Sequence, residues 1–174
     1  MKLETPSMQH TRLFLDAVRR SRTLHGRWVS PPATLAQYRE FVRRFSMPTH
    51  IGHFVCTPEG ALAGVINVSE IVRGAFCSAY IGYYALAPHD GRGYMRDGLR
   101  VVIGLAFKRY ALHRLEANIQ PDNLRSRVLV KSLGFRLEGY SPRYLKIRGR
   151  WRDHERWAIT AEEWPVRRRA TSLV

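Results

Sequence analysis

The 174-residue sequence has little of three things: cysteine, acidic side chains and long apolar runs. Its two cysteines, Cys56 and Cys77, stand apart without a CxxC pair, which argues against a disulfide scaffold and fits a reducing compartment. No apolar run approaches the ~18 residues that a membrane-spanning helix needs. The N-terminus also lacks the uninterrupted apolar stretch of a signal peptide. We therefore expect a cytoplasmic protein that does not enter a membrane.

Acidic residues number 14 against 29 lysines and arginines, which gives a formal net charge of +15. A positive field of this size favours anionic partners such as RNA, the ribosome or a polyphosphate cofactor. Arginine accounts for 25 of the 29 basic residues, however, and a GC-rich genome produces that bias unaided. The basic residues are also spread along the chain without the aromatic spacing of single-strand binders. Association with RNA or the ribosome is thus permitted by the charge and not established by it.

The periodicity of the apolar residues predicts a single α+β domain over residues 1–174. Two helices come first, over 8–22 and 34–45, and Thr34 is a suitable N-cap for the second. After the second helix, the spacing of apolar residues changes to the two-residue period of strands. The segments "HFVC" and "ALAGVINVSEI" flank the turn "TPEG" and together predict an antiparallel hairpin.

The centre of the chain combines a strand over 78–86, a helix that starts near Met95 and a strand over 114–119. A strand–helix–strand unit of this kind places its strands parallel, with a right-handed crossover. Asn123 caps the next helix, which ends at Gly134. Three strands follow, in "FRLEGY", "YLKI" and "WRDHERWAI". The sequence therefore predicts a mixed sheet with one parallel joint.

The stretch "HDGRGYMRDG", residues 89–98, joins the central strand to the helix and carries Gly91 and Gly93 at the joint. The first N–H groups of a helix have no intrahelical partner and lie at its positive end, so they bind phosphate where glycines let the backbone approach. A plain tight turn is the alternative. A dinucleotide-binding loop needs a third glycine where Arg96 stands, and a P-loop needs a GK[ST] that is absent. The residues alone leave a phosphate site and a plain turn open.

The uninterrupted stretch from "IGYYALAPHDGRGYMRDG" to "KSLGFRLEGY" resembles the acetyl-CoA-binding core of the GNAT N-acetyltransferases. The flanking segments "INVSEIVRGAF" and "YLKIRGRWRDHERWAI" are similar to the ribosomal-protein-alanine acetyltransferases of the RimJ/RimL type, RimJ most closely. The resemblance implies a GNAT fold, a mostly antiparallel sheet with a splayed central parallel pair and helices on both faces. It further implies an acetyl-CoA core over about 78–140 and an acceptor side from 8–75 and 140–165. Such proteins often begin with an edge strand, which here must be short or absent, since only "MKLETPS" precedes the first helix.

In this family the pattern Q/R-x-x-G-x-G/A marks the pyrophosphate loop, and here it falls on the segment from Asp90 to Met95. The resemblance implies that backbone N–H groups of this loop hold the CoA pyrophosphate, and the residues concerned are Gly91, Arg92, Gly93, Tyr94, Met95 and Arg96. Two positions depart from the pattern. Asp90 replaces Gln or Arg and places a carboxylate near the phosphates, and Met95 replaces Gly or Ala.

The resemblance also assigns contacts to the rest of the cosubstrate. Backbone N–H groups near Tyr84, Ala85 and Leu86 would donate to the thioester carbonyl oxygen, where negative charge builds up. Asn123 would bind the pantetheine arm. Arg127, together with its neighbours on the same helix, would meet the 3′-phosphate, although a solvated helix surface explains these side chains equally well.

Two residues are expected to carry the chemistry. The resemblance implies that Ser126, in the pattern N-x-x-S, is the general acid for the departing thiolate, and the alternative is a first-turn hydroxyl without a catalytic role. Glu116 lies on a core strand and would be the general base, and its alternative is an ion pair with an arginine. The glutamate that serves as base in some RimL-type relatives corresponds here to Leu145, so water-mediated deprotonation also stays open. No metal is expected.

These observations predict transfer of an acetyl group from acetyl-CoA to an amine, with the α-amino group of a ribosomal or other protein N-terminus as the first-choice acceptor. A small amine or an antibiotic is the alternative acceptor. A basic RNA- or ribosome-binding module that has lost transfer is the alternative from another class. The sequence leaves monomer and homodimer open.

Overall fold

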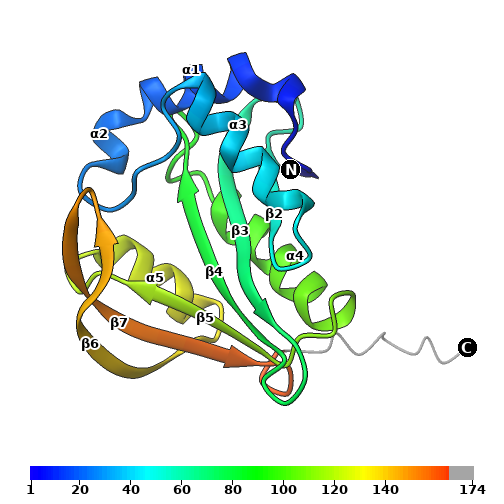
Figure 1. Cartoon of the computed structure of the whole chain (residues 1–174), viewed down its shortest axis with the longest axis vertical. Coiled ribbons are helices and arrows are strands. Elements are labelled where there is room, and N and C mark those ends of the chain that lie inside the picture. The colour runs from blue at the N-terminus through cyan, green and yellow to red at the C-terminus, as the bar shows by residue number, and fades with distance from the viewer. Residues whose placement is uncertain (165–174) are drawn as a thin grey trace, which may run out of the picture.

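The computed structural model describes residues 1–164, and residues 165–174 of the predicted domain lie outside the described residues. Seven strands form one sheet in the order β1-β2-β3-β4-β5-β7-β6 (Figure 1). The strands are β1 (Lys2–Glu4), β2 (Ile51–Cys56), β3 (Leu62–Val72), β4 (Ser78–Ala85), β5 (Arg114–Ile119), β6 (Arg136–Ile147) and β7 (Arg150–Thr160). The helices are α1 (Thr11–Arg20), α2 (Arg22–His25), α3 (Leu35–Arg43), α4 (Tyr94–Lys108) and α5 (Leu124–Ser132). Within residues 1–164, only β4 and β5 pair in parallel, which confirms the predicted mixed sheet.

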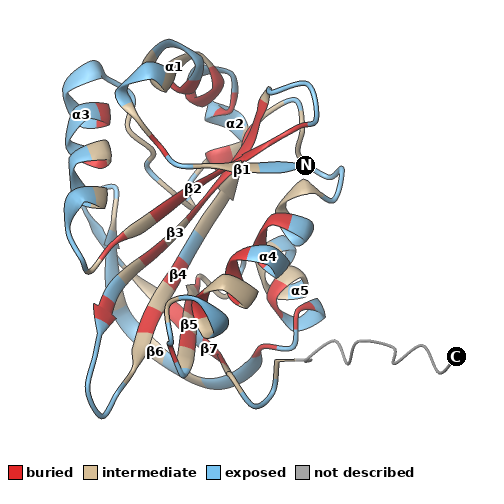
Figure 2. Ribbon diagram, turned by 90° about the vertical axis from the view of Figure 1, so that its right-hand side faces the viewer, coloured by how far each residue is buried: buried red, intermediate tan, exposed pale blue. Residues whose placement is uncertain are grey.

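Helices cover both faces of the sheet, as the resemblance implied (Figure 2). One face packs on α4 and α5 through a large apolar cluster that includes Ile103 and Leu115. The other face, over the first strands, packs on α1 and α3. There the Phe14 ring stacks on Phe41 and on Phe54, with a centroid distance of 5.6 Å in each case.

The parallel strands β4 and β5 pair over a short length and then diverge (Figure 1). Ser78–Tyr80 lie beside Arg114–Glu116, whereas the rest of β4 pairs with β3 and the rest of β5 pairs with β7. The backbone N–H and C=O groups on the facing sides of the diverged segments therefore lack a ladder partner. Such groups need a hydrogen bond from a side chain, water or a ligand.

The prediction of one continuous helix over 8–22 is wrong. The segment forms a 3-10 turn at Met8–His10, then α1 and α2, and the break falls at Ser21. The Ser21 hydroxyl donates to the Ala17 carbonyl at 2.7 Å and accepts the Ala87 N–H at 2.9 Å. These bonds tie the end of α1 to the loop after β4, a long-range contact that a helical period does not reveal.

The prediction of three final strands is also wrong, because "FRLEGY" and "YLKI" form the single 12-residue strand β6. The strand passes through Pro142, which sequence reasoning treats as a break. β6 is the outer strand of the sheet, where a missing N–H need not cost a ladder bond. Shifts of register after Leu137 and Ser141 absorb the irregularity. The first edge strand, β1, is present and short, with three residues.

Both predicted helix caps are confirmed. The Thr34 side chain accepts the N–H of Gln37 at the start of α3. The Asn123 side chain accepts the N–H of Ser126 at the start of α5. Gly134 follows the end of α5 with a φ of +92°, the left-handed conformation that favours glycine.

Two glycines lie inside α4, and only one has a packing reason. An ideal Cβ at Gly98 would stand 2.7 Å from Val55 Cγ2 and 3.2 Å from Ile66 Cδ1, so the helix meets the sheet closely there. An ideal Cβ at Gly104 would meet only Trp164 Nε1, at an ordinary 3.7 Å. Glycine costs a helix about 1 kcal/mol relative to alanine at either position.

We expect Gly98→Ala to lower the free energy of unfolding by about 1–3 kcal/mol, because overpacking against Val55 outweighs the gain in helix propensity. Gly104→Ala is the matched control and should raise it by up to about 1 kcal/mol. Urea denaturation followed by circular dichroism measures both. Equal effects at the two positions would contradict the close contact between α4 and the sheet.

Candidate active site

The divergence of β4 and β5 opens into a cavity of about 840 Å³. Its walls are the end of β4, the loop and first turn of α4, the start of α5, and α2 with the residues that follow it. Nine of the predicted site residues line it, namely Tyr84, Ala85, Gly91, Gly93, Tyr94, Met95, Arg96, Asn123 and Ser126. The other predicted residues, Leu86, Arg92, Glu116 and Arg127, lie outside the lining.

One wall of the cavity is apolar and open. Leu124 and Val128, one turn apart on α5, are 63% and 68% exposed. Both line the cavity together with Trp28 and Val29 from the segment after α2. Apolar side chains gathered around a concavity mark a surface that a ligand covers. This wall suits an amphipathic ligand arm, and no spacing in the sequence identified it.

Gly91 and Gly93 shape the entry to α4. Their φ angles are +75° and +84°, and Gly93 is the N-cap residue. A Cβ at either glycine would meet no atom within 4 Å, so the glycines serve the backbone turn and leave open space beside it. The N–H groups of the first turn have no intrahelical partner and lie at the positive end of α4. The arrangement fits a phosphate or pyrophosphate group.

The structure explains both departures from the family pattern. The Asp90 carboxylate lies 3.7 Å from the guanidinium of Arg125 on α5, which offsets its charge beside the phosphate-binding turn. The Met95 side chain lies against the sheet, because a Cβ at Gly64 would stand 2.0 Å from Met95 Sδ. Gly64 therefore makes room for a methionine where the family usually has glycine or alanine.

The backbone at the end of β4 offers fewer free donors than the sequence implied. The Leu86 N–H donates to the Ala63 carbonyl at 2.8 Å, and its side chain is fully buried. Because antiparallel ladder bonds alternate, the Tyr84 N–H also faces β3, whereas the N–H groups of Tyr83 and Ala85 face the opening. The Ala85 carbonyl accepts a hydrogen bond from His25 Nε2 at 2.9 Å. Ala85 is thus the better placed of the three predicted donors.

Ser126 is held from two sides. Its N–H donates to Asn123 Oδ1 at 3.2 Å, and its hydroxyl oxygen lies 2.5 Å from the Tyr83 hydroxyl oxygen. Burial raises the pKa of Tyr83 to about 12, so this phenol stays protonated at neutral pH. Sequence reasoning missed Tyr83, because one tyrosine in an aromatic strand carries no local signal.

Glu116 forms an ion pair with an arginine, which was the alternative to its role as general base. Arg114 Nε donates to Glu116 Oε1 at 2.9 Å, and the same guanidinium also pairs with Glu138 of β6. The Glu116 side chain projects from the opposite face of β5 to Leu115 and Ala117, which pack on the α4–α5 side. A carboxylate engaged by a guanidinium is poorly placed to take a proton from an amine.

The predicted phosphate contact of the Arg127 side chain is not available, because that side chain has other partners. Arg127 Nε lies 2.9 Å from a carboxylate oxygen of Glu155, and its Nη1 donates to the Pro121 carbonyl at 3.2 Å. The Arg92 side chain is exposed and outside the cavity lining. Only the backbone of Arg92, between the two loop glycines, stays near the phosphate-binding turn.

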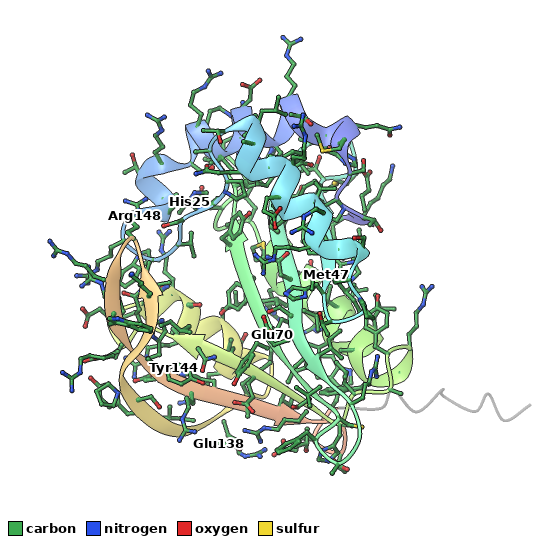
Figure 3. The ribbon with its side chains drawn as sticks, viewed as in Figure 1. His25, Met47, Glu70, Glu138, Tyr144 and Arg148 are labelled. Carbon is green, nitrogen blue, oxygen red and sulfur yellow. The ribbon has the colours of Figure 1, made fainter. Side chains whose placement is uncertain are left out.

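His25 separates the cavity from a second one of about 560 Å³. Its ring packs edge-on to Tyr84 at 5.3 Å, and burial lowers the pKa of the imidazole, so His25 is neutral at pH 7. Arg22 and Arg148 line the second cavity. Figure 3 shows Arg148, at the tip of the β6–β7 hairpin, beside His25.

Residues 1–164 contain neither a metal-binding cluster nor a membrane-spanning helix. In this range no three His, Cys, Asp or Glu side chains gather closely enough to hold a metal ion. None of the helices over the same residues has the length and apolarity to cross a membrane. The polar groups that the cavity offers include hydroxyls, backbone N–H groups and two histidines, His25 and His89.

Comparison with known proteins agrees with this geometry. Residues 1–136 match the family described as the acetyltransferase (GNAT) domain. The chain belongs to the GNAT acetyltransferase family. The ribosomal protein uS5-alanine N-acetyltransferase of Escherichia coli (strain K12) is 41% identical over 106 residues, which are 61% of this chain and 55% of that enzyme. The chain spans less than two thirds of the length of the curated relatives that it matches.

Solved GNAT structures show the same architecture. Mycobacterium smegmatis RimJ in complex with CoA-disulfide has a TM-score of 0.86 and 26% identity, and covers 94% of this chain and 83% of its own. A spermidine N-acetyltransferase from Vibrio cholerae in complex with CoA and spermine has a TM-score of 0.79 and 19% identity, with 93% and 96% covered. The second likeness shows the fold alone. Together they confirm the predicted GNAT fold and the resemblance to RimJ.

We expect Gly93→Val to abolish acetyl-CoA binding, because a β-branched residue cannot hold a φ of +84° and the phosphate-binding turn would be displaced. Gly60→Val is the matched control, since Gly60 has a φ of +92° in the β2–β3 turn, away from the cavity. Isothermal titration with acetyl-CoA, CoA and NAD measures affinity. Unchanged acetyl-CoA affinity in Gly93→Val would mean that the stretch is only a turn.

Proposed function

We propose that the protein transfers the acetyl group of acetyl-CoA to an amine. The observation that carries this proposal is the cavity at the end of β4, between the starts of α4 and α5, which joins a phosphate-binding helix start, an apolar wall and the hydroxyl of Ser126. These parts match, in order, a pyrophosphate, a pantetheine arm and a thioester sulfur. Residues of about 78–140, together with Trp28 and Val29 of the apolar wall, form the acetyl-CoA side, and the rest of 8–75 and residues 140–164 form the acceptor side.

In the proposed reaction a neutral amine attacks the thioester carbonyl carbon. The Ala85 N–H, which faces the opening, donates to the carbonyl oxygen as charge builds up on it. Ser126 donates to the sulfur as the carbon–sulfur bond breaks. Water removes the amine proton, because Arg114 occupies the Glu116 carboxylate.

The preferred acceptor is the α-amino group of a protein N-terminus, for example that of a ribosomal protein. The name of the Escherichia coli relative supports this choice. Electrostatics favour it over a polyamine, because a polycation needs several free carboxylates. Glu116 and Glu138 are both paired with arginines, and the second cavity presents Arg22 and Arg148. An uncharged or acidic peptide suits this surface better than spermidine.

The acceptor class is tested by incubating the protein with acetyl-CoA and either a peptide with a free N-terminal alanine or spermidine. We expect acetylation of the peptide α-amine at a rate at least about tenfold above that of spermidine, because like charges oppose polyamine binding. Mass spectrometry locates the acetyl group, and the same peptide with a blocked N-terminus is the control. A preference for spermidine would support the small-amine alternative. Salt-dependent RNA binding without acetyl-CoA binding would support the RNA-binding module.

We expect Ser126→Ala to lower kcat by about 10- to 100-fold with little change in acetyl-CoA affinity, because it removes a donor to the leaving sulfur. Ser132→Ala is the matched control on the same helix, since its exposed hydroxyl donates to the Leu129 carbonyl. Steady-state kinetics and isothermal titration measure the two quantities. An equal loss of kcat and affinity would contradict the role of Ser126 as hydrogen-bond donor to the leaving sulfur.

A further inference from the structure

Tyr83 lines the cavity but has no part in the roles assigned so far. It projects from β4 towards α5, and its hydroxyl oxygen lies 2.5 Å from Ser126 Oγ and 3.2 Å from the Ser126 carbonyl oxygen. This contact joins two elements that are 43 residues apart in the sequence, across the gap between the diverged strands. The hydroxyl that the mechanism needs is therefore in contact with a second hydroxyl.

A tyrosine hydroxyl has one proton, so the two contacts cannot both receive it. If Tyr83 donates to the Ser126 carbonyl, the Ser126 proton is used in the short contact between the hydroxyls. If Tyr83 donates to Ser126 Oγ, the Ser126 proton is free to point into the cavity. The contact with Oγ is the shorter one, and the second arrangement is the one that leaves a donor for a ligand.

We propose that Tyr83 is a positioning residue that donates its proton to Ser126 Oγ and thereby directs the Ser126 O–H at the thioester sulfur. This inference rests on the proposed acetyl transfer. The Asn123 cap and Tyr83 then hold Ser126 from opposite ends, the cap at its N–H and the phenol at its hydroxyl. A rotamer fixed at both ends costs less to organise when the substrate binds.

The chemical step balances without a change in the charge of Tyr83. The nitrogen–carbon bond forms, the carbon–sulfur bond breaks and its electron pair leaves on sulfur. The Ser126 O–H stabilises this thiolate by a hydrogen bond, and the proton released by the amine reaches the sulfur through water. Because the pKa of Tyr83 is raised to about 12 and that of a thiol is about 8.5, full transfer of the phenolic proton to sulfur is disfavoured by more than about a thousandfold. The Tyr83–Ser126 hydroxyl pair therefore donates a hydrogen bond to the sulfur and does not transfer its proton.

The test uses the full chain with Tyr83→Phe, Ser126→Ala and the double variant. Tyr38→Phe is the matched control, because Tyr38 is a buried tyrosine that donates one hydrogen bond, to the Ser7 carbonyl, and does not line the cavity. Three quantities are measured for each variant: the affinity for acetyl-CoA, kcat with the best acceptor peptide, and the pKa of the thiol of bound CoA from its thiolate absorbance. The last measurement needs no acceptor.

We expect Tyr83→Phe to lower kcat by about tenfold, to leave acetyl-CoA affinity within about twofold and to raise the pKa of the bound thiol above its value in wild type. These effects should vanish in the Ser126→Ala background, and Tyr38→Phe should show none of them. Wild-type kcat and thiol pKa in Tyr83→Phe would overturn the inference while leaving the acetyl transfer intact. Failure of the wild-type protein to bind acetyl-CoA or CoA would overturn the proposed function itself.

Discussion

The divergence of β4 and β5 is the constraint on which the rest of the site depends. Because the two strands are parallel, their carboxyl ends lie at the same end of the sheet. The helices that follow them, α4 and α5, both begin at that end. The strands part after Tyr80, so the N–H groups of Tyr83 and Ala85 face an opening instead of a neighbouring strand. Two helix N-termini and a set of unpaired backbone donors thus surround a single cavity.

Several residues at this opening contact a partner on a different helix or strand. Met95 fits because Gly64 on β3 has no side chain, and Asp90 is offset by Arg125 from α5. His25, from α2, donates to the Ala85 carbonyl and lies between the two cavities. Acidic residues are scarce in this chain, and those near the opening are already paired. The carboxylates Glu116 and Glu138 are already paired with arginines, and the second cavity presents Arg22 and Arg148.

Local patterns predicted most of the fold, and they failed where a distant contact decides. The caps at Thr34 and Asn123 were predictable, because a cap involves residues three positions apart. The break at Ser21 was not, because its hydroxyl bonds Ala87 in a loop distant in the sequence. In the site, the glycine turn and the N-x-x-S pattern were visible as short motifs. Tyr83 and the apolar wall were not, since their partners lie on other elements.

The sequence by itself determined the α+β class, the single parallel joint, the glycine-rich helix start and the positive charge. Each of these follows from neighbouring residues or from composition, and needs no knowledge of what packs against them. Only the tertiary structure decided which groups are free to act. It showed that the Leu86 N–H and the Glu116 carboxylate already have partners, and that Ser126 lies against Tyr83. Availability is a property of hydrogen bonds made across the fold, and the order of residues along a chain does not record them.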